Sequence, residues 1–151
     1  MAPTLEEWER QLPPVPTPVA NYTPFRRSGR IAYTAGVVPM VDGKLQAEGR
    51  LGEDLTLEEG YEAARTCALL ALSILREHLK GLDRIAQVLR AVVFVASAPG
   101  FHDQARVADG ASDLLVEVLG RTGKPTRVAV GVAELPLDAP VEIALTVETR
   151  P

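Results

Sequence analysis

The segment between Thr56 and Gly81 constrains the fold of this chain more than any other part of its sequence. Apolar residues recur at helical spacing along it, which predicts one long helix with an apolar face over residues 57–80. Thr56 and Glu59 have the spacing of a capping box, and Gly81 is a residue type that ends helices. A helix of this kind buries its apolar face against a second layer.

The rest of the sequence predicts that this second layer is a β-sheet. A hairpin is expected around the turn Ser28-Gly29, with a loop from residue 37 to residue 54 after it. The later elements follow in the order strand 88–97, helix 102–119, strand 126–133 and strand 141–149. The order ββαβαββ predicts a two-layer α+β domain, with a mostly antiparallel sheet packed against two helices.

The N-terminal part adds a short helix and a proline-rich stretch. Residues 4–12 are expected to be helical, because Thr4 and Glu7 have the spacing of a second capping box. The prolines between residues 12 and 25 exclude helix and regular strand pairing. This stretch is either an extended arm lying on the domain or a mobile linker. With no repeat visible, residues 1–151 are expected to be a single domain, of which residues 1–17 are the N-terminal helix and arm.

Charge and histidine content argue against two kinds of partner. The net charge is −4 and no run of Lys or Arg occurs, which disfavours nucleic-acid binding. The two histidines, His78 and His102, lack the spacing of a metal-binding pair. We therefore expect neither nucleic acid nor a metal ion to bind this chain.

Cysteine usage and hydropathy bear on the compartment. The single cysteine, Cys67, cannot form an internal disulfide, which fits a reducing compartment. The first residues are acidic without an apolar signal region, and no apolar run reaches the length of a membrane span. The expected location is the cytoplasm, without membrane association.

Strand parity links Arg127 to Glu142. Val128, Val130 and Val132 share one face of strand 126–133 and Arg127 lies on the other; Glu142 lies opposite the apolar face of strand 141–149. If both β-branched faces point to the helices and the strands pair as a hairpin, Arg127 and Glu142 are neighbours on the opposite face. A guanidinium binds a carboxylate through two parallel hydrogen bonds, so this face is a candidate anion site. The alternative is a cross-strand pair that only stabilises the sheet.

The same face is expected to carry small residues rather than a charged coat, namely Ala129, Gly131, Ala144 and Thr146. We therefore expect this face to pack against another chain. Small residues exposed singly to solvent are the ordinary alternative.

Two segments resemble the signature of the RidA/YjgF family, reactive intermediate deaminases formerly called endoribonuclease L-PSP. The late segment reads PTRVAVGVAELP at 125–136 and APVEI at 139–143. The early segment reads NYTP at 21–24 and IAYTAGVVP at 31–39. The resemblance covers residues 18–149 and is to the longer, YjgF-like branch of the family.

This resemblance implies a chorismate-mutase-like fold and a homotrimer with active sites between subunits. It implies hydrolysis of enamines and imines such as 2-aminoacrylate, 2-iminopropanoate or 2-iminobutanoate to 2-keto acids and ammonia, without a cofactor. By the resemblance, Arg127 binds the substrate carboxylate, and Glu142 positions or activates the attacking water. Tyr22 lines the pocket from a neighbouring subunit, Gly36 offers a backbone contact, and Ala129 belongs to the substrate-binding residues. A Glu beside an Arg is expected to stay ionised.

Departures from the family pattern leave the substrate open. Ala129 stands where many members have Cys or Ser. Asp109-Gly110 stands near the expected place of a helix asparagine, and a carboxylate there would repel an anionic substrate. The helix 102–119 is longer than usual, and the helix 4–12 is extra. Two other functions stay open: a non-catalytic module that binds small carboxylates, and an endoribonuclease or translation inhibitor, against which the net acidity argues.

Overall fold

The long helix predicted from the sequence is α2 (Leu57–Leu79) in the computed structural model, which describes residues 1–151. The capping box is formed: the Thr56 hydroxyl accepts from the backbone N–H of Glu59, and the Glu59 carboxylate accepts from the backbone N–H of Thr56. The chain leaves the helix through Lys80 in the left-handed conformation, immediately before Gly81. Both predicted ends of the helix are therefore confirmed.

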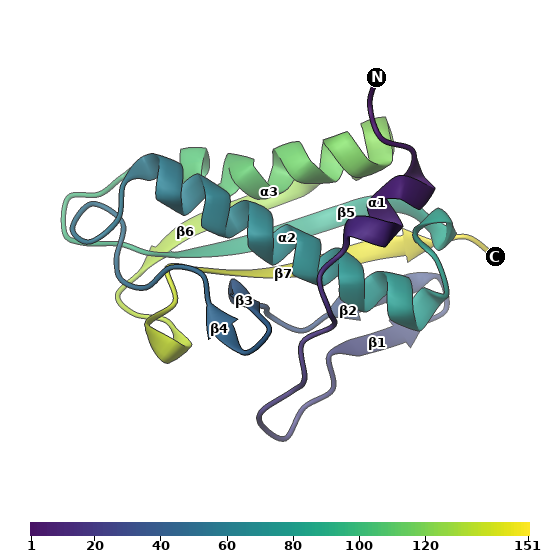
Figure 1. Cartoon of the computed structure of the whole chain (residues 1–151), viewed down its shortest axis with the longest axis horizontal. Helices are drawn as coiled ribbons and strands as arrows, with labels where there is room; N and C mark the ends of the chain where they lie inside the picture. Colours follow the sequence, from purple (N-terminus) through teal and green to yellow (C-terminus); the bar gives the residue numbers. More distant parts are fainter.

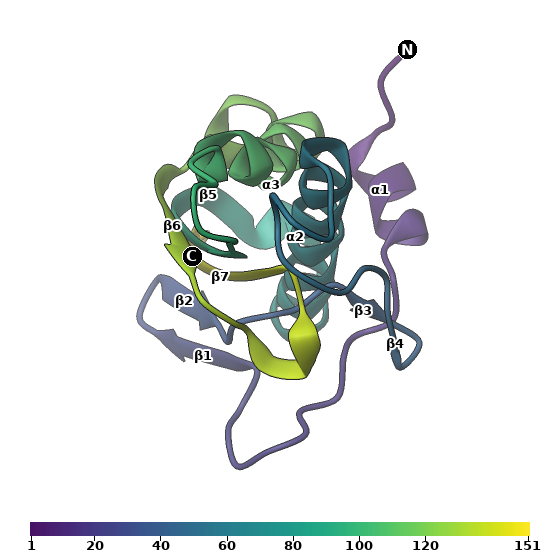
Figure 2. The same ribbon diagram turned by 90° about the vertical axis from the view of Figure 1, so that its left-hand side faces the viewer.

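A five-stranded sheet forms the second layer, and α2 and α3 (Gln104–Leu119) lie across one of its faces (Figures 1 and 2). The pair formed by β5 (Ile85–Ala96) and β6 (Thr126–Val132) is parallel, and the other pairs are antiparallel. The predicted two-layer α+β architecture is confirmed. The strand order in the sheet is β1 (Phe25–Ser28), β2 (Ile31–Thr34), β7 (Val141–Thr149), β5 (Ile85–Ala96) and β6 (Thr126–Val132).

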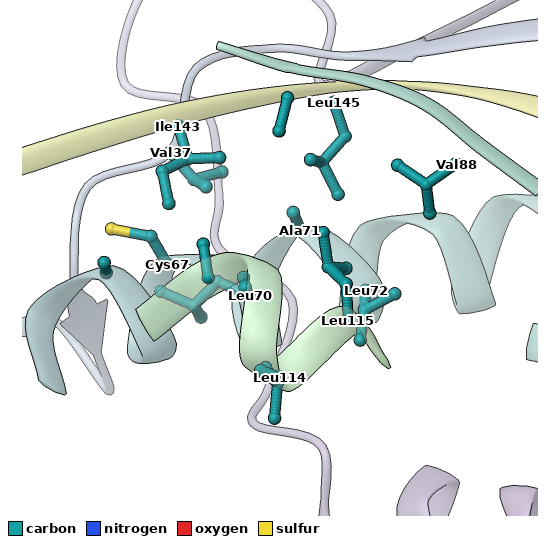
Figure 3. Packing of buried hydrophobic residues seen from close by; sticks show 14 of the residues in the cluster. Val37, Cys67, Leu70, Ala71, Leu72, Val88, Leu114, Leu115, Ile143 and Leu145 are labelled. Carbon is teal, nitrogen blue, oxygen red and sulfur yellow. The ribbon is translucent and has the colours of Figure 1, made fainter. Parts of the chain in front are cut away.

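One core fills the space between the two layers. The apolar face of β7 points into it, and Figure 3 shows Ile143 and Leu145 directed toward α2. Cys67 of α2 is fully buried in this core, and its thiol lies 3.7 Å from the carbonyl oxygen of Val141. Burial raises the pKa of the Cys67 thiol well above its ordinary value, with a further contribution from the charge of Glu142.

Two helices approach each other closely at Gly110. A Cβ at this position of α3 would meet the backbone carbonyl group of Tyr61 in α2, 2.9 Å from its carbonyl carbon and 3.2 Å from its Cα. Backbone atoms cannot move aside as a flexible side chain can. Glycine is therefore required here by helix packing.

We expect Gly110→Ala to lower the free energy of unfolding by about 2 kcal/mol, within the range seen for overpacked cores. The alanine would gain roughly 0.5–1 kcal/mol of helix propensity, which is too little to offset the clash. Chemical denaturation measures the change. Arg106→Ala, on the exposed side of the same helix, is the control and should change stability by less than about 0.5 kcal/mol. A Gly110→Ala protein as stable as the control would contradict this packing argument.

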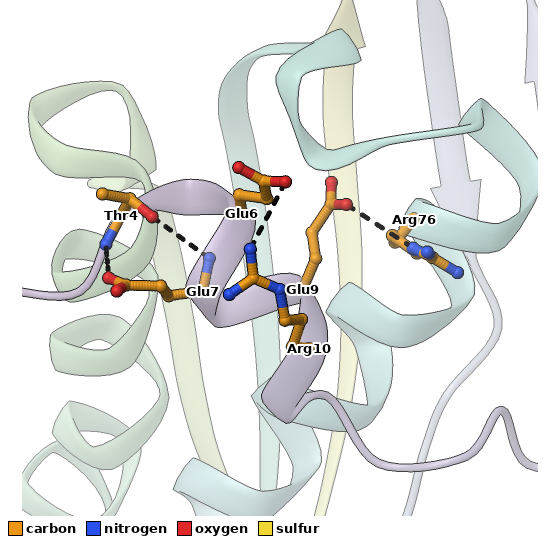
Figure 4. A network of polar contacts seen from close by, with 6 residues as sticks. All are labelled: Thr4, Glu6, Glu7, Glu9, Arg10 and Arg76. Atoms are coloured by element: carbon orange, nitrogen blue, oxygen red, sulfur yellow. Dashed lines mark hydrogen bonds and ion pairs between the residues drawn. The ribbon is translucent and has the colours of Figure 1, made fainter.

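The N-terminal helix is α1 (Leu5–Gln11), with the predicted capping box of Thr4 and Glu7 (Figure 4). Trp8 is buried in the core. The Glu9 carboxylate accepts a hydrogen bond of 2.7 Å from the backbone N–H of Leu82 and lies 3.7 Å from Arg76. These contacts fix α1 on the end of α2.

The proline-rich stretch is an arm that lies on the domain, as the first of the two sequence readings predicted. Its start is held by the Ser73 hydroxyl, which donates to the carbonyl oxygen of Pro13 at 2.7 Å. Its end is held by the backbone N–H of Ala35, which donates to the carbonyl oxygen of Pro24 at 2.8 Å. Between these points Val15 packs against the core.

Two sequence expectations about pairing are wrong. The last two strands do not form a hairpin, because β5 lies between β7 and β6 and pairs with both. The segment expected to be a loop contains a small hairpin of β3 (Met40–Val41) and β4 (Lys44–Leu45). Its turn is Asp42-Gly43, where both residues have positive φ.

Candidate functional site

Glu142 lies on the sheet face opposite the helices. Its neighbours on β7, Val141 and Ile143, are fully buried beneath α2, so alternation turns the Glu142 side chain to the other face. There it packs against Gly36, which follows β2. A Cβ on Gly36 would meet Oε2 of Glu142 and would lie 3.0 Å from its Cδ. Glu142 therefore lies on the face that strand alternation predicted, and its side chain contacts Gly36.

Glu142, Gly36 and Tyr22 line one hollow at the end of the sheet. Its other walls are mostly apolar and come from the arm, from the segment after β2 and from the turn before β7: Val19, Ala20, Thr23, Ala35, Val38, Pro136 and Leu137. We call this space the Glu142 hollow. The Tyr22 side chain is half exposed at its rim.

The Glu142 carboxyl has no cation beside it. None of the ion pairs in the structure includes this residue. Burial raises the pKa of Glu142 above the ordinary value of 4.5. The sequence expectation of a Glu held ionised by a neighbouring Arg is therefore not met. A carboxylate with a raised pKa in an apolar hollow is a stronger base than an ordinary Glu, which suits a group that accepts a proton from water.

Arg127 lies on the other side of the sheet, so the predicted Arg127–Glu142 neighbourhood is wrong. The parallel register pairs Arg127 with Ala91 and Ala129 with Val93, and both of these β5 residues are buried beneath the helices. Arg127 and Ala129 therefore face the helices. The valines of β6 take the open face instead, where Val130 is 39% exposed.

The Arg127 guanidinium already holds one carboxylate. Its Nη1 donates to Oδ1 of Asp109 at 2.7 Å and to the Ser112 hydroxyl at 3.2 Å, both from α3. Its Nε and Nη2 make no hydrogen bond within the chain. Arg127 also lines an open polar hollow, together with Lys124 and Glu117 among others. The departure noted in the sequence thus has a structural consequence: Asp109 neutralises part of the charge of Arg127.

The other acidic residues of this polar hollow are held by α2. Asp113 accepts a hydrogen bond of 2.6 Å from the Tyr61 hydroxyl. This hydrogen bond is the main reason why the pKa of Tyr61 is raised to about 12. Glu117 accepts two hydrogen bonds from Arg65, at 3.0 and 2.8 Å, and this pairing lowers the pKa of Glu117. These contacts bind α3 to α2 and leave Arg127 and Lys124 as the cations of the hollow.

The five residues selected from the sequence therefore fall into two groups. Glu142, Tyr22 and Gly36 share the Glu142 hollow, whereas Arg127 and Ala129 lie on the helix-covered face. Sequence reasoning missed Leu137, which lines the Glu142 hollow and has φ of 62° within the short turn η3 (Pro136–Asp138). The sequence shows Leu137 between Pro136 and Asp138, just before the last strand, but nothing in it indicates the backbone conformation of this leucine.

No three or more His, Cys, Asp or Glu side chains are grouped so that they could hold a metal ion. None of the helices combines the length and the apolar character needed to cross a bilayer.

Comparison with known proteins identifies the family. Residues 5–148 match the family model described as "YjgF/chorismate mutase-like, putative endoribonuclease". Protein TCP17 of Trypanosoma cruzi is 41% identical over 149 residues, covering 98% of this chain and 93% of that protein. A crystal structure from Shewanella oneidensis, titled a "putative endoribonuclease", has a TM-score of 0.91 at 32% identity, covering 97% of this chain and 99% of that one.

A more distant likeness is to the fold alone. Escherichia coli TdcF, whose crystal structure contains bound serine, has a TM-score of 0.67 at 20% identity, covering 93% of this chain and 95% of that one. The family match spans both layers of the fold and both hollows. This chain is a member of the YjgF/chorismate mutase-like family.

Proposed function

We propose that this protein hydrolyses small reactive enamines and imines that carry a carboxylate, giving 2-keto acids and ammonia. The observation that carries the proposal is the Glu142 carboxyl, whose pKa is raised by burial in an apolar hollow beside Gly36 and Tyr22. An imine is already electrophilic, so its hydrolysis needs mainly orientation, a positioned water and proton transfer. The segments 125–136 and 139–143, which resemble the RidA/YjgF signature, imply the same reaction class.

The proposed reaction uses the residues of the hollow directly. Glu142 accepts a proton from a water molecule as the water oxygen bonds to C2 of the imine. That proton passes to the nitrogen as the C=N double bond opens, which gives a carbinolamine with a hydroxyl and an amino group on C2. Glu142 then takes the proton of this hydroxyl and delivers it to the amino nitrogen. The C2–N bond breaks, the nitrogen leaves as ammonia, and C2 becomes the keto carbon. Tyr22 closes one wall of the hollow, and the backbone at Gly36 contacts the substrate. No step in this scheme requires a cofactor.

The carboxylate is proposed to bind Arg127 of a neighbouring subunit in a homotrimer. Within one chain Arg127 and Glu142 lie on opposite sides of the sheet, so a shared site needs two chains. Exposed apolar side chains on the open face, including Val130 and Tyr33, support association through that face. β6 is an edge strand, which leaves Arg127 accessible from the side of the sheet.

Two further observations bear on substrate and location. TdcF was solved with serine, which carries its carboxylate and its nitrogen on the same carbon, as a 2-imino acid does. This supports a small amino-acid-like substrate for the present chain. We also propose a cytoplasmic location, because the one cysteine is a free buried thiol.

Asp109→Asn is expected to lower KM for a carboxylate substrate about threefold to tenfold, with little change in kcat. Asparagine keeps a hydrogen-bond acceptor for Arg127 and removes the negative charge that competes with the substrate. Steady-state kinetics measure both parameters. The control is Asp103→Asn, a solvent-exposed change at the start of the same helix. A KM that rises in Asp109→Asn would contradict the proposed use of Arg127.

The function is tested by following imine decay. A pyridoxal-phosphate dehydratase generates 2-aminoacrylate from serine, and semicarbazide traps the imine that remains. The protein should reduce trapping and accelerate pyruvate formation in proportion to its concentration. Binding of pyruvate without acceleration would instead indicate a non-catalytic carboxylate-binding protein. Ribonuclease activity that survives purification and is lost in Glu142→Gln would favour the reaction named in the family description.

A further inference from the structure

A side pocket adjoins the Glu142 hollow beneath the proline-rich arm. It shares six lining residues with that hollow: Val19, Tyr22, Ala35, Gly36, Val38 and Leu137. The two spaces therefore lie side by side at these residues. Beyond the shared residues, the side pocket reaches Ile74 of α2 and Met40 of β3, and its outer wall is the arm from Pro16 to Pro18.

The side pocket is apolar and of limited size. Its lining contains no charged side chain, and Thr17 and Tyr22 are the only side chains in it with a hydroxyl. Its volume is about 90 Å³. A cavity of about 150 Å³ holds a benzene ring, so this one suits a smaller aliphatic group of three or four carbons.

The wall of the side pocket is fixed in place. The arm is held at both ends, by Ser73 at Pro13 and by Ala35 at Pro24. Prolines restrict the chain between these two points. An aliphatic group that enters the pocket therefore meets a preformed surface, so little of the binding energy is spent on ordering it.

Leu137 is held in a strained conformation at the entrance. Both Leu137 and Asp138 have φ of 62°, a region that non-glycine residues seldom occupy. The conformation is maintained by backbone hydrogen bonds from Asp138 to Leu135 at 3.2 Å, from Ala139 to Pro136 at 3.1 Å and from Gly49 to Asp138 at 2.9 Å. Despite this support the Leu137 side chain is 60% exposed, so its position is not explained by packing within the chain.

We propose that the side pocket is a specificity subsite for the side chain of a branched aliphatic 2-imino acid, with Leu137 as its specificity-determining residue. The inference rests on the proposed function, because it assumes that the reacting carbon sits at Glu142. The imine of leucine places an isobutyl group where the imine of alanine has a methyl group. The isobutyl group fills the side pocket, and Leu137 covers it from the solvent side.

The expected preference follows from apolar burial. Each additional buried carbon raises kcat/KM about fourfold, so the three extra carbons of the leucine imine should give a preference over the alanine imine of up to about 60-fold. Amino-acid oxidase supplies either imine from its amino acid, and competition with semicarbazide measures its hydrolysis. Calorimetry with 4-methyl-2-oxopentanoate and pyruvate measures binding of the corresponding products without turnover.

Variants separate the side chain of Leu137 from its backbone. Leu137→Ala keeps a Cβ at positive φ and removes the cover, and Leu137→Gly also relieves the strain. Both should lose about fivefold to tenfold for the leucine-derived ligands and less than about twofold for the alanine-derived ones. Lys80→Gly, another non-glycine residue at positive φ but outside both hollows, is the matched control and should leave the preference unchanged.

The outcomes distinguish this inference from the proposed function. Affinity that grows with side-chain length and depends on Leu137, without turnover, supports the subsite and rejects the hydrolase. Turnover without preference for the larger side chain, or a preference that both Leu137 variants retain, overturns the subsite and leaves the hydrolase standing. Neither turnover nor binding rejects both.

Discussion

Glu142→Gln is expected to lower kcat for imine hydrolysis by about two orders of magnitude or more and, at neutral pH, to make the folded protein more stable. A positioned acid–base group contributes roughly 10²–10⁴-fold to a rate, and glutamine cannot accept the proton of the attacking water. Glutamine fills the same space in the hollow without the charge. Steady-state kinetics and thermal unfolding of one preparation measure both effects.

The stability effect has a defined pH dependence. Burial raises the pKa of Glu142 in the folded protein, so the folded state binds more protons than the unfolded chain between the ordinary Glu pKa and the raised value. The contribution of Glu142 to the free energy of unfolding of the wild type therefore falls as the pH rises through the window from the ordinary Glu pKa to the raised one. The variant should be the more stable protein above the window and should lose this advantage below it. The acid limb of kcat/KM for the wild type should likewise lie above the ordinary Glu pKa.

Glu148→Gln is the matched control for this experiment. Glu148 lies on the same strand and the same face, three alternating positions away from Glu142, and pairs with Gln87 at 3.1 Å rather than lining the hollow. It should leave kcat unchanged. A Glu142→Gln protein with wild-type kcat would remove Glu142 from the reaction, whatever its stability.

Arg127→Ala is expected to lower kcat/KM by about two orders of magnitude, mainly through KM. Removing one partner of a hydrogen-bonded charge pair costs a complex several kcal/mol, and the substrate carboxylate would lose its only proposed cation. The exposed Asp109 left behind affects stability by less than about 1 kcal/mol. Arg106→Ala, an exposed arginine on α3, is the control and should retain wild-type kinetics.

Mixing the two inactive proteins tests whether Arg127 and Glu142 act across a subunit boundary. In a cyclic trimer each site would take Arg127 from one subunit and Glu142 from the next. When equal amounts of the Arg127→Ala and Glu142→Gln chains are unfolded, mixed and refolded together, three quarters of the trimers contain both chains. Each mixed trimer has one intact site out of three, so the mixture should show about one quarter of wild-type activity. Mixed protein without activity would mean that the two residues do not combine across subunits, and a monomer in sedimentation would exclude the trimer itself.

Most of the fold could be predicted from the sequence because its signals are local or periodic. The capping box of Thr56 and Glu59 makes its hydrogen bonds to backbone N–H groups within one turn, so it can be recognised from the sequence without tertiary structure. The alternation in β7 placed Glu142 correctly, because the apolar face of this strand is buried against a helix and the alternate residues must face the other way. Gly36 and Tyr22 were selected by the family motif, and both line the Glu142 hollow.

Arg127 could not be placed from the sequence. Period two divides β6 into a valine face and an Arg127 face, but it does not say which face the helices cover. That was decided by the parallel register with β5 and by the position of β6 at the edge of the sheet, where α3 offers the polar side chains of Asp109 and Ser112. The usual rule that the more apolar face is the buried one gave the wrong side here.

The sequence by itself determined the three α-helices, the strands of the main sheet and their order along the chain, the family, and the side of the sheet on which Glu142 lies. These depend on residue spacing along one segment at a time. Only the tertiary structure decided that Glu142 is without a cation, that Arg127 is paired with Asp109 and that the arm and Leu137 enclose an apolar pocket. Each of these depends on the distance between side chains far apart in the sequence, which strand order and register set and local pattern does not contain.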